Sequence, residues 1–506
     1  MKYNKGTTVR FIIIVAFALV EVVLVWMLFY YFNEQAAYIE YILRLLSVFL
    51  IVHISNTSVH LSTDIPWIIL IALSPVFGTA TYLLIGGNVF LSQTYRNILS
   101  EEFKAREYYK QDKNTLLKAK EEYPENVGQF NYLSRGAFYP VYHNEGFDYY
   151  RNGEEGFPVI LEELKKAKKF IFMEYFIVEE GVMWSAIQDV LEEKVKEGVD
   201  VRVMYDDVGS MFTLNPLFVT NMENRGIKCV SFNRVNPIIN VIINHRDHRK
   251  ILVVDGNVAF TGGINLADEY INQKERFGYW KDNVCRIRGS AVWSMTVMFL
   301  TNWNALKHED DDYEKYRADT AEEVQKGYLV PYGDTPLDTE LTGQNVYLNI
   351  ISQAKKYVYI MTPYLITDTD VTNALILAAK RGVDVRIITP GIPDKKIIYQ
   401  ITRSNYATLL DGGVKVFEYT PGFVHGKVFV SDDIVATVGT INLDYRSLYL
   451  HFENGIYMYG MPEVMDIRDD MRETLMACRV IRKGSIRMHL GKRMALAFVK
   501  LFSSML

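Results

Sequence analysis

The chain has little cysteine and no excess of positive charge. Three cysteines among 506 residues, Cys229, Cys285 and Cys478, show no paired spacing. Disulfide frameworks and zinc sites need regularly spaced cysteines, so neither is expected, and a reducing compartment fits. Lys and Arg number 55 against 60 Asp and Glu, a net charge of −5. General nucleic-acid binders are basic, so no nucleic-acid partner is expected.

Charge is also nearly absent from the first 95 residues, which hold three apolar runs. The runs cover 11–32, which only Glu21 interrupts, then 45–54, and 65–87, which Pro75 and Gly78 break. Since a membrane-spanning helix needs about 20 apolar residues, we expect transmembrane helices here. A signal peptide is the competing interpretation, but the first run is too long and lacks a small-residue cleavage site.

The positions of Lys and Arg predict how this region is oriented. Positive residues precede the first run and follow the third, and Arg44 is the one Lys or Arg between the runs. Positive charge stays on the cytoplasmic side, so both ends of the region should lie inside, with an even number of crossings. Either the first and third runs span, or the first and second span and the third dips in and returns near Pro75.

A short motif occurs twice in the chain. It reads His-x-Lys, four residues, Asp, six residues, then Gly-[Gly/Thr]-Ile-Asn. His-x-Lys alone arises often by chance, but two copies with the same internal spacing point to a shared function. The first copy contains His248, Lys250, Asp255 and Asn265, and the second contains His425, Lys427, Asp432 and Asn442.

The spacing of the motif predicts its chemistry. Residues 251–254 and 428–430 are rich in β-branched side chains, which favours a strand in each copy. On a strand, the His and Lys two residues apart project from one face. An imidazole beside an ammonium suits a phosphate, because Lys holds the oxygens while His attacks or donates a proton.

The end of each motif adds further candidates. We expect a helix to open at 265–269, where backbone N–H groups and the amide of Asn265, or of Asn442 in the second copy, favour an anion. Asp255 precedes Gly256, and Asp432 follows Ser431, in sequences typical of turns. Turn chemistry and a supporting electrostatic role in catalysis are both open for these two residues.

The duplicated motif resembles the signature of the phospholipase D superfamily. This resemblance implies one site at the interface of two similar halves, a covalent phospho-histidine intermediate and no metal. No cluster of His, Cys and carboxylates has ligand spacing either, so neither a metal nor another cofactor is expected. The segments 66–86, 277–282 and 443–454 are similar to those of bacterial cardiolipin synthases.

The duplication extends beyond the motif. Segments 167–172 and 226–228 correspond to 354–359 and 413–415, and 198–202 recurs unchanged at 382–386. Each half should run strand, helix, strand, helix, strand, catalytic strand, an α/β arrangement with a largely buried sheet. The predicted fold is therefore α/β, with two similar phospholipase D-like halves forming one site, preceded by N-terminal transmembrane helices. The expected divisions are a membrane region 1–95, a juxtamembrane connector 96–145, a first half 146–306, an inter-half connector 307–344, a second half 345–478 and a basic amphipathic tail 479–506.

Three segments outside the motifs have two interpretations each. The apolar insertion 237–243, which the second half lacks, suits an added core strand or a loop that dips into the membrane. The tail 479–506 holds seven Lys or Arg and no acid, which suits a helix on an anionic membrane surface or a packed C-terminal helix. The acidic run 309–312 is interpreted as a solvated face.

A catalytic His needs a group that fixes its tautomer and stabilises its cation, commonly a carboxylate on the far nitrogen. Asp282 and Glu453 lie at similar distances downstream of the two motif histidines, and we expect each to support the His of its own half. Glu453 is thus expected to support His425. His245 is interpreted as structural, and His451 fits no pattern.

The resemblance implies a cardiolipin synthase that joins two phosphatidylglycerol molecules and releases glycerol, with His248 as nucleophile and His425 as acid and base. The expected setting is the bacterial cell membrane, with a multi-pass anchor, a cytoplasmic catalytic part and anionic lipids as partners. A phospholipase D-type hydrolase would use the same residues with water as acceptor. A superfamily nuclease is opposed by the apolar runs and the net negative charge. Donor preference and oligomeric state are left open.

Overall fold

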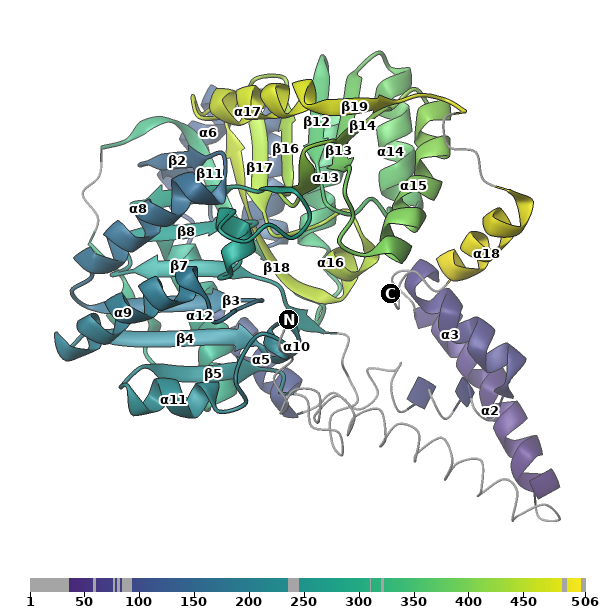
Figure 1. Cartoon of the computed structure of the whole chain (residues 1–506), viewed down its shortest axis with the longest axis horizontal. Coiled ribbons are helices and arrows are strands. Elements are labelled where there is room, and N and C mark those ends of the chain that lie inside the picture. Colours follow the sequence, from purple (N-terminus) through teal and green to yellow (C-terminus); the bar gives the residue numbers. More distant parts are fainter. Residues whose placement is uncertain are drawn as a thin grey trace.

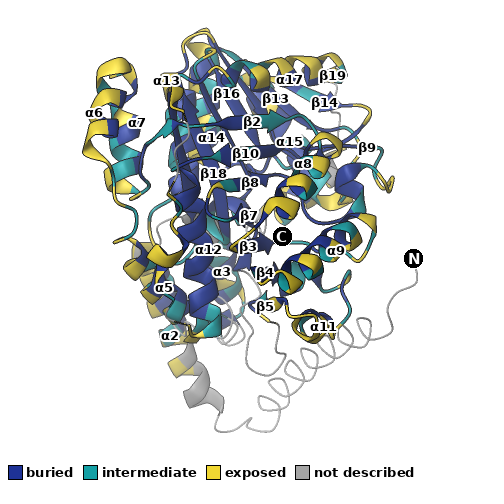
Figure 2. Cartoon of the chain, turned by 90° about the vertical axis from the view of Figure 1, so that its left-hand side faces the viewer, coloured by how far each residue is buried: buried dark blue, intermediate teal, exposed yellow. Residues whose placement is uncertain are grey.

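The computed structural model describes residues 36–57, 61–75, 78–79, 82–83, 93–234, 245–309, 311–319, 323–484 and 489–501. Two β-sheets with flanking helices form most of it, one at the left of Figure 1 and one at the upper right. The strands of both sheets are buried, while exposed residues gather on the outer helices (Figure 2). The predicted α/β fold with two similar halves is confirmed.

The first sheet has seven strands and belongs to the first half. β3, β4 and β5 are parallel, whereas β7 pairs antiparallel with β3. Alternate residues of β7 face opposite layers: Leu252 packs with the helices α8 and α9, and Ile251 packs with α12. In sheet order the strands are β2 (Phe147–Tyr150), β10 (Val284–Arg288), β8 (Val258–Gly262), β7 (Lys250–Val254), β3 (Phe170–Tyr175), β4 (Asp200–Asp206) and β5 (Lys228–Phe232).

The helices of the first half fill both sides of that sheet, as expected for a sheet buried on two faces. α12 is buried along almost its whole length, so it acts as a central element between layers. The helices are α8 (Gly153–Lys166), α9 (Val182–Lys196), α10 (Asp207–Ser210), α11 (Phe218–Asn224), η5 (Asp268–Ile271) and α12 (Val292–Lys307).

The second sheet repeats this plan and is extended at both edges. Alternate residues of β12 again face two layers: Val358 packs with α13, α14 and α15, and Tyr359 with α17. In sheet order the strands are β1 (Tyr142–Asn144), β11 (Gln325–Asp334), β18 (His451–Tyr459), β17 (Val435–Gly439), β16 (Val428–Ser431), β12 (Tyr357–Met361), β13 (Asp384–Pro390), β14 (Lys415–Tyr419) and β19 (Cys478–Ile481). The helices are α13 (Thr342–Gln353), α14 (Thr369–Lys380), α15 (Lys396–Asp411), α16 (Tyr445–Tyr449) and α17 (Val464–Met476).

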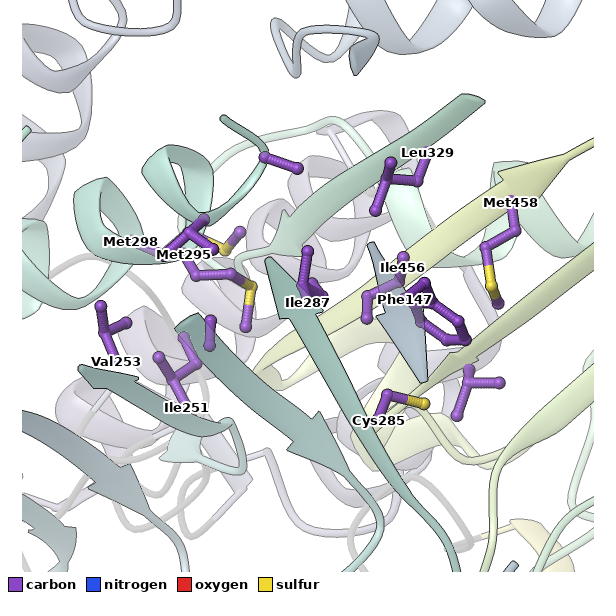
Figure 3. Packing of buried hydrophobic residues seen from close by; sticks show 14 of the residues in the cluster. Phe147, Ile251, Val253, Cys285, Ile287, Met295, Met298, Leu329, Ile456 and Met458 are labelled. Atoms are coloured by element: carbon purple, nitrogen blue, oxygen red, sulfur yellow. The ribbon is translucent and has the colours of Figure 1, made fainter. Parts of the chain in front are cut away.

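The two halves share a hydrophobic core. Phe147 and Ile287 of the first sheet lie near Ile456 and Met458 of β18, with Met295 of α12 close by (Figure 3). Burial of apolar surface contributes roughly 25 cal/mol per Å², so this shared core fixes how the halves sit against each other. The motifs of the two halves are thereby held at one interface.

Two short strand pairs cross the interface. β6 (Arg246–Asp247) of the first half pairs in parallel with the start of β18. β15 (Gly422–Val424) of the second half pairs in parallel with β9 (Tyr279–Lys281) of the first. Each crossing strand comes directly before a motif histidine, so each histidine enters the site beside the other half.

The segments expected to be connectors are part of the folded body. α5 (Gln93–Ala105) packs against α12, and β1 pairs antiparallel with β11. β11 falls within the interval 307–344 yet lies between β1 and β18 in the second sheet. The polar composition of 307–344 does not indicate this strand. Its neighbours in the sheet, β1 and β18, cover it on both sides. The other elements are α6 (Lys113–Glu122), η3 (Pro124–Asn126), α7 (Val127–Asn131), η4 (Tyr132–Gly136) and η6 (Tyr313–Tyr316).

The described residues of the acidic run lie at the surface, as expected of a solvated face, since Glu309 and Asp312 are exposed and Asp311 is half-buried; two of them also pair with buried side chains. Arg202 Nη1 donates to Asp311 at 2.6 Å, and Trp303 Nε1 donates to Glu309 at 2.9 Å. The guanidinium of Arg202 is buried, and a buried cation is costly unless it is paired. The acidic run supplies that pairing.

The predicted transmembrane helices are not found in the part of the chain that the structure describes. α2 (Ala36–Thr57) and α3 (Leu61–Leu73) pack against each other. No helix of the described residues is both long and apolar enough to cross a membrane. α2 contains Glu40 and Arg44, and α3 has 13 residues. The run 11–32 and the insertion 237–243 lie outside the described residues.

The tail contains one strand and one helix. β19 extends the second sheet beside β14, and α18 (Leu490–Leu501) lies close to α15. Leu496 is buried, whereas Met494 and Phe498 are 66% and 60% exposed. The tail helix is therefore packed through one side and leaves apolar side chains on another.

Candidate active site

The two His-x-Lys pairs lie together at the interface of the halves. All four side chains are buried. Lys250 Nζ donates to the carbonyl oxygen of His248 at 2.7 Å, and Lys427 Nζ donates to the carbonyl oxygen of His425. Each ammonium is thus fixed by the backbone of its own histidine, and Lys427 Nζ also lies 3.0 Å from both ring nitrogens of His425. Both histidines stand just before β7 and β16 and not on these strands.

Each histidine is held by a carboxylate of the opposite half. His248 Nδ1 lies 3.0 Å from Glu453 Oε1 and 2.9 Å from Oε2. His425 Nδ1 lies 2.7 Å from Asp282 Oδ2. The expectation that each carboxylate supports the histidine of its own half is wrong: Glu453 contacts His248, and Asp282 contacts His425. Both carboxylates are fully buried.

The crossing strands explain this exchange. The backbone N–H of His248 donates to Phe452 O at 2.9 Å, next to Glu453. The backbone N–H of His425 donates to Lys281 O at 2.7 Å, next to Asp282. β6 and β15 therefore deliver each histidine to the strand that carries the other half's carboxylate.

The variable Gly or Thr of the motif matches the carboxylate beside it. A Cβ on Gly263 would lie 1.8 Å from Asp282 Oδ1, so only glycine allows the Asp282 carboxylate to approach. At the corresponding position, Thr440 Oγ1 donates to Glu453 Oε2. The first half thus leaves room for its carboxylate, and the second half holds its carboxylate with a hydroxyl.

A cavity of about 370 Å³ lies over the two histidines. Its wall combines aromatic and aliphatic side chains with charged ones, as in sites for amphipathic ligands. The polar lining includes His248, Asn265, Glu269, Arg276, Asp394, Lys395, His425, Asn442, Asp444, Arg446 and His451. Both imidazoles direct Nδ1 at a carboxylate, and Nε2 of His425 lies 3.0 Å from Lys427 Nζ, the group suited to hold a phosphate oxygen beside it.

The surroundings of the two histidines differ. The ring centroid of His425 lies 5.5 Å from Tyr270, 5.3 Å from Trp280 and 6.0 Å from Phe423. The ring centroid of His248 lies 5.0 Å from that of Phe176 and 5.7 Å from that of His451. His425 therefore has three aromatic rings around it, whereas His248 has one aromatic ring and a second imidazole.

Burial and charge keep both imidazoles neutral. Burial lowers the pKa of His248 well below its usual value, and Lys250 and Lys427 lower it further. Burial and then Lys427 lower the pKa of His425 to about 4, while Asp282 opposes the decrease. Because carboxylates favour the imidazolium, Asp282 makes His425 easier to protonate than burial alone would allow.

The pKa values of both motif lysines are lowered, so they lose their protons more easily than exposed lysines do. Burial, followed by the charge of Lys427, lowers the pKa of Lys250 to about 7. Burial lowers the pKa of Lys427 to about 8, against the opposing effect of Asp282 and Glu453. An anionic phosphate between them would favour both charged forms.

Asp255 and Asp432 lie away from the cavity, at the turn beyond each motif strand. Asp255 accepts hydrogen bonds from the backbone N–H groups of Lys168, Lys169 and Phe170 at 2.7–2.9 Å. Asp432 accepts the corresponding bonds from Lys355, Lys356 and Tyr357 at 2.6–2.9 Å. Each carboxylate connects a motif turn to the start of a neighbouring strand by hydrogen bonds. These contacts stabilise the fold and do not face the cavity.

The two motif asparagines line the cavity with different partners. Asn265 Oδ1 accepts from the Ile177 N–H at 3.0 Å, and its Nδ2 donates to the Tyr270 hydroxyl at 2.7 Å. Asn442 Oδ1 is buried without a partner among the described residues. The helix expected to open at Asn265 is only the short η5 (Asp268–Ile271), because Asn265 is already committed to neighbouring segments.

Two lining residues were missed from the sequence. His451 Nδ1 lies 3.7 Å from Glu453 Oε1, and Arg446 lines the same wall. His451 precedes Glu453 by two residues on β18, so the period of a strand places both on one face and could have revealed it. Within the described residues, His248, His451 and Glu453 also form a group whose ligand atoms lie within 4.8 Å of one another, the arrangement that a metal ion would use. His245 is buried and packs edge-on against Tyr95.

Comparison with known proteins agrees with this geometry. A family described as "Cardiolipin synthase, PLD-like domain" matches residues 160–280 and 347–475, one segment in each half. An uncharacterised protein of Streptococcus mutans is 45% identical over 86% of this chain and 95% of its own length. Cardiolipin synthase 2 of Bacillus anthracis is 36% identical over 82% of each chain.

A solved structure shares the fold. The phosphatidylserine synthase of Haemophilus influenzae matches 76% of this chain and 100% of its own with a TM-score of 0.57 and 15% identity. Fold and site together define a phospholipid-modifying enzyme of the phosphatidyltransferase class. Within that class, the chain belongs to the cardiolipin synthase family of PLD-like proteins.

Proposed function

We propose that the protein transfers a phosphatidyl group from one phosphatidylglycerol to a second, giving cardiolipin and glycerol. The observation that carries the proposal is the crossed site, in which two His-Lys pairs from different halves open on the same cavity. Relatives named cardiolipin synthase, which match most of the chain, supply the substrate class. Two lysines between two imidazoles suit one phosphodiester.

In the first step, His248 Nε2 attacks the phosphorus of a phosphatidylglycerol. The bond from phosphorus to the oxygen of the glycerol headgroup breaks, and His425, protonated at Nε2 while the anionic phosphate is bound, gives that proton to the oxygen. The product is a phosphatidyl-histidine and free glycerol. Lys250 and Lys427 hold the phosphate oxygens while the charge redistributes.

In the second step, a hydroxyl of another phosphatidylglycerol passes its proton to His425. Its oxygen bonds to phosphorus as the nitrogen–phosphorus bond breaks, which restores His248 and yields cardiolipin. One phosphodiester is exchanged for another, so no nucleotide is required.

The surroundings support these roles. A nucleophile must be neutral, and the pKa of His248 is lowered well below its usual value by burial and both lysines. An acid must gain a proton, and Asp282, 2.7 Å from His425 Nδ1, opposes the effect of burial on the His425 pKa. Pairs of titratable groups with separated environments commonly divide acid and base roles in this way.

The proposed setting is the cytoplasmic face of a bacterial cell membrane, where the N-terminal region anchors the enzyme and anionic lipids surround it. The apolar runs and the distribution of Lys and Arg support this placement. Exposed apolar side chains on α2, such as Leu45 and Phe49, are consistent with contact to lipid.

The test is the product formed by the purified full chain from phosphatidylglycerol in vesicles. We expect cardiolipin and glycerol in equal amounts, separated and quantified by mass spectrometry. Hydrolysis by the same site would instead give phosphatidic acid and glycerol. Phosphatidic acid as the main product would replace this proposal with the hydrolase.

A further inference from the structure

Arg446 is a partly buried arginine whose Nε has no hydrogen-bond partner among the described residues. It lies in α16 and lines the same cavity as the two motif histidines. Its side chain has no hydrogen-bond or ion-pair partner in the part of the chain that the structure describes, and its Nε is fully buried. Arginine is normally buried with a carboxylate or a phosphate, so this side chain suits an anionic group of a ligand in the cavity.

The nearest carboxylates are already engaged. Asp444 accepts hydrogen bonds from the backbone N–H groups of Arg446 and Ser447. Asp206 accepts from the backbone of Gly209 and Asp247, and lies 3.5 Å from Arg246 Nη1. Burial lowers the pKa of the Arg446 guanidinium, the charge of Asp444 opposes the decrease, and the charge of Arg246 adds to it. A bound anion would oppose the decrease further.

The reacting phosphate does not need the positive charge of Arg446. Lys250 and Lys427 stand beside the two imidazoles and supply the cations that one phosphodiester needs. Two phosphatidylglycerol molecules bring two phosphates, and only one of them reacts. One glyceryl unit separates the attacking hydroxyl of the second lipid from its own phosphate, so that phosphate must also lie near the cavity.

His451 offers a matching group for a hydroxyl. Neither of its ring nitrogens has a hydrogen-bond partner among the described residues. It lines the same cavity as Arg446, and a neutral imidazole offers one N–H donor and one acceptor nitrogen.

We propose that Arg446 and His451 form the subsite for the second phosphatidylglycerol, with Arg446 binding its phosphate and His451 a glycerol hydroxyl. This inference rests on the proposed function and names the acceptor that the site prefers. The arginine selects an anionic acceptor over glycerol or water, because a guanidinium forms bidentate charge-assisted hydrogen bonds with a phosphate.

The two steps can be measured separately with an activated donor. A nitrophenyl ester of phosphatidic acid, labelled in its acyl chains, releases nitrophenol when the phosphatidyl-enzyme forms. Unlabelled phosphatidylglycerol and glycerol then compete for the intermediate, which gives labelled cardiolipin or labelled phosphatidylglycerol. The ratio of these products reports acceptor binding alone.

We expect Arg446→Gln to lower the ratio of cardiolipin to phosphatidylglycerol by roughly 10- to 100-fold, as loss of a hydrogen bond to a charged group does. Nitrophenol release should fall far less. Arg446→Lys should recover part of the ratio, and His451→Phe should lower it by roughly fivefold. Arg472→Gln, which changes a half-exposed arginine outside the cavity, is the matched control and should leave both measurements unchanged.

Three outcomes would overturn the inference. An unchanged product ratio in Arg446→Gln would show that the arginine does not bind the acceptor. Nitrophenol release that falls as far as cardiolipin formation, in Arg446→Lys as well, would assign Arg446 to the reacting phosphate. If the wild-type protein makes phosphatidic acid and no cardiolipin, the proposed function itself fails. The amplitude of nitrophenol release counts correctly folded sites in each variant.

Discussion

The two histidines come from copies of one motif, yet the ring of His425 lies among three aromatic rings, whereas the ring of His248 lies between one aromatic ring, that of Phe176, and the imidazole of His451. Trp280 and His451 stand at corresponding positions, each two residues before the carboxylate that supports a histidine. The Trp280 ring lies 5.3 Å from His425, and the His451 ring 5.7 Å from His248. Duplication thus preserves the reacting groups, while the residues beside them differ enough to separate their roles.

The carboxylates differ in the same way. Asp282 has the shorter side chain and reaches His425 past Gly263, where no side chain intervenes. Glu453 reaches His248 at two oxygens, lies near His451 and accepts a hydrogen bond from Thr440. Asp282 is shared as well, since it accepts from the Asn283 N–H at 2.9 Å. Asp282 opposes the lowering of the His425 pKa by burial, whereas burial and both lysines lower the His248 pKa well below its usual value. The difference favours protonation at His425 and neutrality at His248.

Removal of the reacting groups should have the largest effect. His248→Ala and His425→Ala should each lower cardiolipin formation by roughly 10³-fold or more, because nucleophile and acid are both required. Lys250→Ala and Lys427→Ala should cost on the order of 10²-fold. Initial rates with phosphatidylglycerol vesicles measure this, and a tenth of wild-type activity in either His variant would exclude a shared site.

Exchange of each carboxylate for an amide should change the environment of one histidine only. Glu453→Gln and Asp282→Asn should each lower the rate on the order of 10²- to 10³-fold, because the imidazole loses its preferred tautomer. In spectra of ¹⁵N-labelled histidine, Glu453→Gln should shift the signals of His248 and leave those of His425. The spectra of His248→Asn and His425→Asn show which signal belongs to which histidine. Shifts in the opposite histidine would contradict the crossed pairing.

The pH dependence should follow the lysines. In the free enzyme the pKa values of Lys250 and Lys427 are lowered to about 7 and about 8, so both cations are present below these values and lost above them. We expect kcat/KM to fall as pH rises through this range. Bound phosphate raises both pKa values, so kcat should fall only at higher pH. A kcat/KM that stays level up to the ordinary lysine range would refute the lowered values.

Asp255 and Asp432 should affect stability more than activity. Each accepts three backbone N–H groups, and the amide of Asn cannot accept all of them. Asp255→Asn and Asp432→Asn should each lower the free energy of unfolding by roughly 1–2 kcal/mol. Thermal unfolding in detergent measures this, and turnover at low temperature is the control. A large loss of turnover at unchanged stability would return these residues to a catalytic role.

Much of the fold and the reacting residues could be predicted because they depend on local order along the chain. The β7 and β16 strands follow from their β-branched residues, and the proximity of Lys250 to His248 follows from their spacing along the chain. The pairing of His248 with Glu453 could not be predicted, because it depends on where β6 meets β18 in another half. β11 was missed because the identity of its sheet neighbours, and not its composition, buries it.

The central claim is that the two surroundings assign His248 as nucleophile and His425 as acid, and covalent labelling tests it most directly. An activated donor such as the nitrophenyl ester needs no acid for its leaving group, so His425→Asn protein should still accept a phosphatidyl group. Mass spectrometry of the digested protein should find an acid-labile, base-stable adduct on His248. An adduct on His425 in the reciprocal His248→Asn protein, with none on His248 in His425→Asn, would contradict the assignment and reverse the roles.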